Sequence, residues 1–270
     1  MLERVFGYQR IADMHVHFRD EEQAYKETIA HGLEVARDQA VLVVGDMPNL
    51  KRPVTNEERI LERFELARRA NIPEVAYGIY IGATANSEQM KRAVELARKY
   101  SPEKDPRFFV AGIKAYMGES VGDLAIKELE EQIIVYETAS KEGYGEGEET
   151  GVLGIHAEKE KHMIRDKNGK QYWDPRRPQT HCDARPQEAE TESIKDQIAM
   201  YKDTKSRFKL HIHHTSVPQS IELIYQAREE GIDVSAGICP HHLFLDYFDM
   251  NLLLKMNPPL RAGGSNISLL

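Results

Sequence analysis

Short apolar runs alternate with longer segments of helical period along most of the chain. The runs are rich in Val, Ile and aromatic residues, which favour strands. The segments between them carry apolar residues three and four positions apart, as in helices that cover a sheet with one face. This alternation predicts an α/β fold of repeated βα units, with parallel strands near residues 11–18, 40–47, 75–83, 108–117, 151–157, 209–216 and 233–240. Seven units are one short of a closed TIM-type (β/α)₈ barrel, and we expect the missing unit to follow Leu270.

Three of the expected helices carry start signals. Thr55 and Glu58 are spaced as a capping box, Ser87 opens a second helix, and Ser216 with Pro218 precedes a third. The apolar positions expected on their buried faces are Ile60, Phe64 and Ala67, then Met90, Val94 and Ala97, then Ile221, Ile224 and Tyr225.

Two polar stretches interrupt this rhythm. Residues 141–150 are rich in Gly and Glu and are expected to form a solvated loop. Residues 166–185 are too long for an ordinary connector. They follow the fifth strand at the end where barrel enzymes build their active sites, so a lid or substrate loop is expected there, with a plain surface loop as the alternative.

The first chemical signal is a period of two in the first expected strand. Its polar residues are Asp13, His15, His17 and Arg19, which alternate with Met14, Val16 and Phe18. Successive side chains of a strand point to opposite faces, so both histidines share a face and could bind one divalent cation. The alternative is a half-buried strand with a polar outer face.

Lys114 is the second signal. Alternation in the fourth strand points Gly112, Lys114 and Tyr116 into the barrel and turns Ile113, Ala115 and Met117 toward the helices. An unpaired ammonium is costly inside a barrel. Either an inward carboxylate such as Asp13 pairs with the lysine, or carbon dioxide converts it to a carbamate, an anionic oxygen ligand that can bridge two metals.

More histidines follow later strands. His156 ends the fifth, and His211, His213 and His214 lie at the end of the sixth, whereas His31, His162 and His181 are interpreted as ordinary polar residues. Imidazoles on three strand ends with a buried lysine supply enough ligands for two divalent ions ~3.5–4 Å apart, which can generate hydroxide at neutral pH and polarise a carbonyl.

The composition narrows the class of protein. A chain of 270 residues with 41% hydrophobic and 30% charged residues suits one large domain, and we expect residues 1–270 to form a single metal-dependent hydrolase barrel. The net charge of −8 argues against nucleic-acid binding, and no apolar run is long enough for a signal peptide or a membrane span. Cys182 and Cys239 form no disulfide framework, which favours a reducing cytoplasm.

The motifs together resemble the dihydroorotases of the amidohydrolase superfamily. The resemblance spans residues 11 to 261, and the ordered set is far more specific than any one motif. Its segments are Asp13-Met14-His15-Val16-His17-Phe18-Arg19, Asp46-Met47-Pro48-Asn49, Gly112-Ile113-Lys114, Ile155-His156-Ala157-Glu158, His211-Ile212-His213-His214-Thr215-Ser216, Pro240-His241-His242-Leu243 and Lys255-Met256-Asn257-Pro258-Pro259-Leu260-Arg261.

The resemblance implies a role for each of eight residues. His15 and His17 would bind one zinc ion, carboxylated Lys114 would bridge to a second, and His156 and His214 would bind that second ion; Arg19 and Asn49 would hold a substrate carboxylate, and Asn257 would line the site. Strict alternation turns His211 and His213 inward instead of His214, so His213 remains the alternative ligand. A turn ahead of Pro258 is the alternative role of Asn257.

The resemblance is incomplete. Family members carry a metal-binding, proton-shuttling aspartate after an eighth strand, in a segment like Asp-His-Ala-Pro, and many begin with a small β-sandwich; this sequence has neither feature. The catalytic base is therefore unknown. We expect either an incomplete version of a longer chain or a strand contributed by a partner subunit.

The activity that the resemblance implies is interconversion of N-carbamoyl-L-aspartate and L-dihydroorotate in pyrimidine biosynthesis, through hydroxide held by two zinc ions. One alternative is a dihydropyrimidinase, hydantoinase or allantoinase, which would share the metals but not the pocket. Another is a non-catalytic dihydroorotase-like subunit that scaffolds a partner such as a transcarbamoylase. The expected partner of the enzyme is a small-molecule substrate, with a homo-oligomer as a further possibility.

Overall fold

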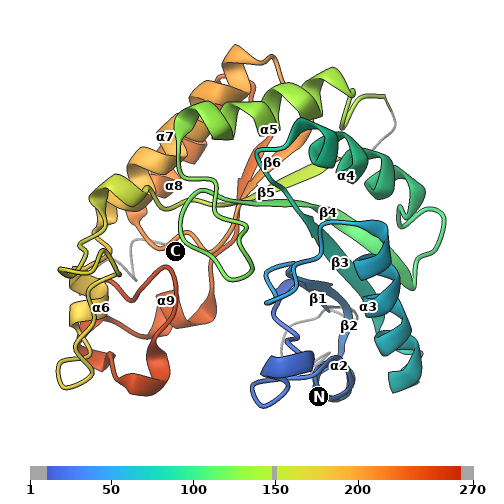
Figure 1. Ribbon diagram of the computed structural model, residues 1–270, viewed down its shortest axis with the longest axis horizontal. Helices are drawn as coiled ribbons and strands as arrows, with labels where there is room; N and C mark the ends of the chain where they lie inside the picture. Colours follow the sequence, from blue (N-terminus) through green and yellow to red (C-terminus); the bar gives the residue numbers. More distant parts are fainter. Residues whose placement is uncertain (1–10, 148–150, 263–270) are drawn as a thin grey trace.

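The computed structural model describes residues 11–147 and 151–262. These residues hold one sheet of seven parallel strands, each hydrogen-bonded to its neighbours in chain order. The sheet curls into an arc with helices along its outer side (Figure 1). The strands are β1 (Ile11–Val16), β2 (Val41–Asp46), β3 (Ala76–Gly82), β4 (Phe108–Tyr116), β5 (Val152–His156), β6 (Lys209–Ile212) and β7 (Val234–Ala236). The predicted incomplete barrel is confirmed, since no eighth strand joins this sheet within the described ranges.

A helix fills each crossover between neighbouring strands, as parallel pairing requires. The long helices are α2 (Ile29–Asp38), α3 (Glu57–Ala70), α4 (Ser87–Lys99), α5 (Leu129–Lys141), α7 (Gln187–Asp203) and α8 (Pro218–Glu229). Shorter elements are α6 (Thr180–Asp183), α9 (Pro240–Phe244) and the 3₁₀ turns η1 (Glu21–Gln23), η2 (Glu160–His162), η3 (Tyr247–Asp249) and η4 (Leu252–Leu254). Within the described ranges, no helix combines the length and apolar character needed to cross a bilayer.

The strand predictions hold to within two residues, except at the ends of β6 and β7. β6 ends at Ile212 because His214 adopts a φ of 43°, a left-handed conformation that takes the chain out of the sheet. β7 ends at Ala236, and Pro240 then opens α9. Both loops therefore begin closer to the sheet than the apolar pattern predicted.

Two helix details correct the sequence analysis. The cap of α3 is Asn56, whose side chain accepts a hydrogen bond from the Arg59 amide, so the capping box of Thr55 and Glu58 is wrong. α8 begins at Pro218 as expected, but Tyr225 is 65% exposed and Ala227 is buried in its place. The buried faces predicted for α3 and α4 are confirmed.

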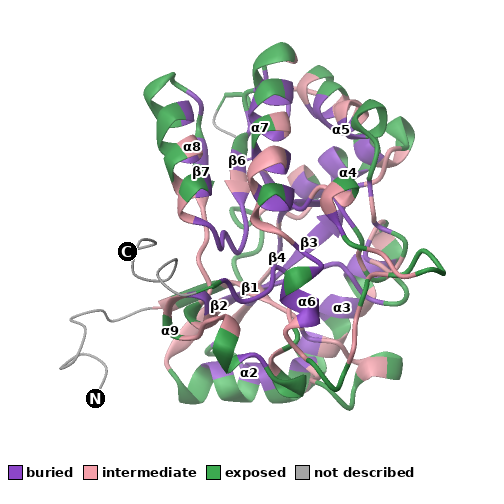
Figure 2. Ribbon diagram, turned by 90° about the vertical axis from the view of Figure 1, so that its left-hand side faces the viewer, coloured by how far each residue is buried: buried purple, intermediate pink, exposed green. Residues whose placement is uncertain are grey.

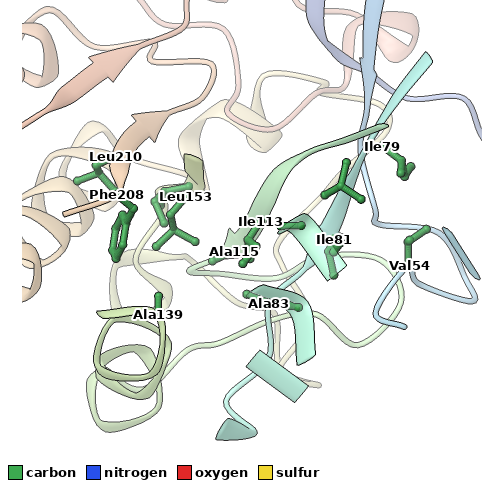
Figure 3. Packing of buried hydrophobic residues seen from close by; sticks show 14 of the residues in the cluster. Val54, Ile79, Ile81, Ala83, Ile113, Ala115, Ala139, Leu153, Phe208 and Leu210 are labelled. Carbon is green, nitrogen blue, oxygen red and sulfur yellow. The ribbon is translucent and has the colours of Figure 1, made fainter. Parts of the chain in front are cut away.

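The hydrophobic core lies between the sheet and the outer helices. Ile113 and Ala115 point into it from β4 and pack in one cluster with Leu153, Leu210 and Phe208 (Figure 3). The helices bury their inner faces and expose their outer ones (Figure 2). The predicted alternation of β4 is thus confirmed on its apolar side, which leaves Lys114 to face the interior of the arc.

The two interrupting segments pack differently. Tyr144 is buried against Phe208 with ring centroids 6.2 Å apart, so the region predicted as a solvated loop is anchored, and its residues 148–150 lie outside the described ranges. The segment 166–185 contacts the C-terminal part of the structure, since Nε2 of His181 lies 2.7 Å from the Met256 carbonyl oxygen. A role for this segment as a lid stays a prediction.

A buried ion pair holds the end of β1 against the end of β2. Arg63 of α3 is fully buried, and its Nη2 donates to Asp46 Oδ2 at 2.7 Å and to the Phe18 carbonyl at 2.6 Å. Asp46 in turn accepts hydrogen bonds from the Phe18 amide at 2.9 Å and from the Tyr77 hydroxyl at 2.6 Å. The backbone between His17 and Arg19 is therefore clamped from both sides.

Replacement of Arg63 tests this clamp. We expect Arg63→Met to lower the free energy of unfolding by ~3–5 kcal/mol, because it leaves the Asp46 carboxylate buried without its cation. Urea unfolding followed by circular dichroism measures the change. Arg69→Met is the control on the same helix, since Arg69 is 72% exposed and pairs with Glu65 at the surface; it should cost less than ~1 kcal/mol. Equal losses in the two variants would contradict the clamp.

Candidate metal centre

The parallel sheet brings the carboxyl ends of its strands to one rim. Register pairs Lys114 of β4 with Gly154 of β5, Tyr116 with His156, and Gly154 with His211 of β6. Polar side chains from β4, β5 and β6 therefore lie at the same height along the strands, and the side chains of β1 approach them across the interior of the arc.

His15 and His17 lie on the inner side of β1, as the period of two predicts. Their ring centroids are 5.3 Å apart, and His15 is 4.7 Å from His213 and 5.2 Å from His214 by the same measure. Burial lowers the pKa of His15 to about 2 and that of His17 to about 3. Both rings are therefore neutral at pH 7, the form in which imidazole binds metals.

Lys114 is buried to 1% exposure, and its Nζ makes no hydrogen bond to the described residues. Burial holds its pKa well below the usual value, which favours the uncharged amine. The salt bridge to Asp13 that the sequence left open is not formed; Asp13 is exposed and accepts a hydrogen bond from the His15 amide at 3.0 Å. The Nζ atom lies 5.2 Å from the centroid of the Tyr116 ring.

His156 and His214 meet at the ends of β5 and β6. Nδ1 of His156 lies 2.9 Å from Nε2 of His214, and the rings are nearly perpendicular. His214 reaches this position because of its left-handed backbone, which overrides the alternation of β6. Nε2 of His156 lies 3.0 Å from a carboxylate oxygen of Glu158, an arrangement that orients a metal-binding imidazole.

His213 is also buried at the rim, so both alternatives for the sixth-strand ligand point inward. A Cβ on Gly154 would stand only 2.4 Å from Nε2 of His213, so only glycine leaves room for this ring. His211 is less buried, and its Nδ1 pairs with the Ser235 hydroxyl at 2.8 Å. His213 contacts His15 and His211, whereas His214 contacts the His156 nitrogen directly.

The two residues expected to bind a carboxylate also lie together. Nη1 of Arg19 donates to the Asn49 carbonyl at 2.6 Å, and its distance to Asn49 Oδ1 is 3.4 Å. The hydrogen bonds of Arg19 to described residues use Nη1, which leaves Nε and Nη2 for a ligand. Asn257 is exposed, and no hydrogen bond joins it to this cluster in the described ranges; its peptide bond to Pro258 is cis.

Sequence reasoning missed the carboxylates that support the rim. Glu158 is fully buried and holds Arg185 through both oxygens. Glu190 of α7 accepts from the amides of Ser216 and Val217, just after His214. Although burial alone raises the pKa of Glu158, Arg185 and His156 hold it below its usual value. One signal in the sequence could have revealed such buried charges: a charged residue at a helix position where the periodicity predicts an apolar one. Arg63, between Ile60 and Phe64, is an example.

The donor set fits divalent cations. Four buried nitrogens here form no hydrogen bond among the described residues: Lys114 Nζ, His17 Nδ1, His213 Nε2 and His156 Nε2, of which the last lies beside the Glu158 carboxylate. Buried polar atoms are rarely left unpaired, and a concentration of such nitrogens matches a metal-binding cluster.

Comparisons with known proteins agree on the kind of protein. No protein-family model matches the chain. It is 32% identical over 262 residues to a dihydroorotase of Pyrococcus furiosus, covering 96% of this chain and 50% of that protein. It is 29% identical over 269 residues to a dihydroorotase of Methanosarcina mazei, covering 94% and 52%. The chain thus spans about half the length of these curated relatives.

Solved structures share the fold at lower identity. An L-hydantoinase (dihydropyrimidinase) from Arthrobacter aurescens superposes with a TM-score of 0.71 at 20% identity, covering 96% of this chain and 54% of that one. A dihydroorotase from Saccharomyces cerevisiae, solved with 5-fluoroorotic acid, gives 0.70 at 17% identity, covering 97% and 65%. The chain is therefore similar over nearly all of its length to about half of each dihydroorotase, and its sheet of seven parallel strands has the fold of the matching part of the solved L-hydantoinase and dihydroorotase.

Proposed function

We propose that this chain carries the metal-binding and carboxylate-binding parts of a dihydroorotase, which interconverts N-carbamoyl-L-aspartate and L-dihydroorotate. The observation that carries the proposal is the position of Arg19, two residues from His17 and hydrogen-bonded to Asn49. A guanidinium beside a cluster of neutral metal ligands suits a cyclic amide that bears a carboxylate.

The proposed metals are two zinc ions. His15 and His17 would hold one, His156 and His214 the other, and Lys114 would bridge them after reaction with carbon dioxide. In that reaction the neutral amine attacks carbon dioxide, a C–N bond forms and one proton leaves, so the product is an anionic carbamate. When bound, zinc supplies Lewis acidity that polarises a carbonyl and lowers the pKa of water.

The low pKa of Lys114 supports the carbamate. The protonated amine of an ordinary lysine at pH 7 cannot attack carbon dioxide, whereas burial lowers the pKa of this lysine and so favours the reactive, uncharged amine. The resulting negative charge would stand among neutral imidazoles rather than acids, so cations would neutralise it. Lys114 and the metals are thus expected to depend on each other.

The chain's own residues orient the substrate and exclude water. Nε and Nη2 of Arg19 would grip the carboxylate of dihydroorotate, and Asn49 would fix the guanidinium through its carbonyl. Hydrolysis then breaks the ring C–N bond, forms a C–O bond with water and delivers a proton to the nitrogen. We assign no general base to residues 1–270, because the resemblance places it after an eighth strand.

A hydantoinase-type enzyme remains the second candidate, since the fold similarity to L-hydantoinase equals that to dihydroorotase. The substrate carboxylate separates the two, because a hydantoin ring without one has no use for Arg19. A scaffold without catalysis would need neither zinc nor a neutral lysine. A cytoplasmic location belongs to the same proposal, and the two free cysteines support it.

Lys114→Met tests the bridge. We expect this variant to stay folded, because an apolar chain replaces a buried amine, and to lose at least one zinc ion per chain after dialysis. Metal analysis measures the loss, with Lys91→Met on the exposed side of α4 as the control. Wild-type protein stripped of metal should also take up zinc more slowly in buffer freed of carbon dioxide. Zinc uptake that ignores both Lys114 and carbon dioxide would refute the carbamate.

The neutral histidines predict a pH dependence of stability in metal-free protein. The folded pKa values of His15 and His17 lie below the ordinary histidine value of 6.5, so the unfolded state binds more protons below that pH. Stability is complete above pH 6.5 and falls as the pH drops below it, by at most ~1.4 kcal/mol per pH unit for each histidine. Urea unfolding between about pH 7.5 and about pH 5.5 measures this. His17→Asn should flatten the dependence, and His31→Asn on the surface should not.

Arg19→Met tests the substrate. A charge-assisted pair is worth ~1.5–3 kcal/mol, so we expect zinc-loaded protein to bind L-dihydroorotate ~10–100-fold more weakly after the change. Calorimetry measures the affinity, and dihydrouracil, which has the ring without the carboxylate, is the control ligand. Equal losses for both ligands would favour a structural role for Arg19. Turnover of dihydroorotate is assayed in the zinc-loaded chain extended by an eighth strand, and its absence there would overturn the proposed activity.

A further inference from the structure

A second group of metal-binding side chains lies just after β7. Cys239, His241 and His242 come from one turn at the start of α9, and one ligand atom of each lies within 4.8 Å of those of the other two. His242 is buried, and Cys239 and His241 are partly buried. The cluster described above contains no thiol, so this group differs from it in chemistry.

His242 is held in the form that binds metals. Its Nε2 lies 3.2 Å from the Pro258 carbonyl oxygen. A carbonyl only accepts, so Nε2 carries the proton and Nδ1 keeps its lone pair. His242 is only 2% exposed, and its Nδ1 atom is buried without a hydrogen-bond partner among the described residues. Metal-binding histidines commonly donate their second ring N–H to a backbone carbonyl in this way.

The other two residues complete the donor set. The rings of His241 and His242 are 4.3 Å apart by centroid, and burial lowers the pKa of both, that of His242 to about 3. Burial raises the pKa of the Cys239 thiol to about 11, so a metal must displace its proton. The thiol proton then passes to solvent, which the partial exposure of Cys239 allows.

We propose that Cys239, His241 and His242 form a zinc site separate from the cluster around Lys114. Two imidazoles and one thiolate favour zinc over magnesium or calcium, which prefer oxygen ligands. Donors in a tetrahedral zinc site stand ~3.5 Å apart, so these side chains need to close by about 1 Å. The fourth position is open to water or to a ligand.

The proposed site lies beside a contact between distant parts of the chain. Nε2 of His242 donates to the Pro258 carbonyl oxygen, and this hydrogen bond joins the segment after β7 to the segment that follows η4. Cys239 also lies near enough to Lys114 for each charge to affect the pKa of the other. The site therefore borders the proposed catalytic rim, but the inference does not depend on the proposed activity.

Cobalt(II) titration of metal-free protein tests the site, because a cobalt–thiolate bond gives a charge-transfer band in the near ultraviolet that cobalt on histidine lacks. We expect the band in the wild type and in Lys114→Met, and its loss in Cys239→Ser with the visible cobalt bands retained. Cys182→Ser is the matched control, since Cys182 is also a free, buried thiol with a pKa raised to about 11; it should keep the band.

A ligand change that spares the thiol completes the test. His242→Gln should weaken cobalt binding at the thiol ~10-fold or more, and His241→Asn should do the same from a more exposed position. Circular dichroism checks that each variant is folded. No thiolate band in the wild type, or a band lost in Cys182→Ser and kept in Cys239→Ser, would overturn the site. Retention of zinc by the Lys114 variant with the band intact would count only against the proposed carbamate.

Discussion

The removal of Lys114 from water is the constraint around which the rim is organised. A lysine amine at 1% exposure that makes no hydrogen bond to the described residues has a pKa held well below its usual value, so burial favours an uncharged amine on β4. Imidazoles that lie close enough for the charge of Lys114 to affect them, such as His15 and His214, also have pKa values lowered by burial. Buried nitrogens in a site of this kind lack hydrogen-bond partners, and a bound metal cation would supply the missing interaction. Its chemistry therefore follows from desolvation more than from any single hydrogen bond.

Three buried carboxylate–arginine pairs stabilise the strand ends that form this rim. Asp46 with Arg63 braces the ends of β1 and β2, Glu158 with Arg185 braces the end of β5, and Glu190 with Arg261 braces the loop after β6. Buried ion pairs add little net stability compared with apolar packing, but breaking one is costly. Here each pair also hydrogen-bonds the backbone or an imidazole beside a candidate ligand, so the pairs set the positions of His17, His156 and His214.

The site divides by chemistry into three regions. Neutral nitrogens occupy the centre, a guanidinium with an amide lies beside β1, and a thiol with two imidazoles lies after β7. The first two are the regions on which the proposed function rests, and the chain is similar to dihydroorotases. The third borders the first through Cys239, and its contact with Pro258 reaches the segment that carries Asn257. The exposed Asn257 favours the turn role over the substrate role in this arrangement.

The amino-acid order alone was enough for the βα rhythm, the inward face of β4 and most of the candidate ligands, because a period of two or 3.6 is local and survives without tertiary contacts. The partners of the buried charges were not accessible in this way, since Arg63 and Phe18 are 45 residues apart and Arg261 and Arg185 are 76 apart. The orientation of His214 also lay beyond the pattern, because one left-handed residue reverses the face that alternation assigns. The local sequence therefore determines which side chains point to each face of a strand. Which of these side chains come into contact is decided only in the folded chain, because the backbone turns and the distant charged partners that bring them together produce no periodic pattern in the sequence.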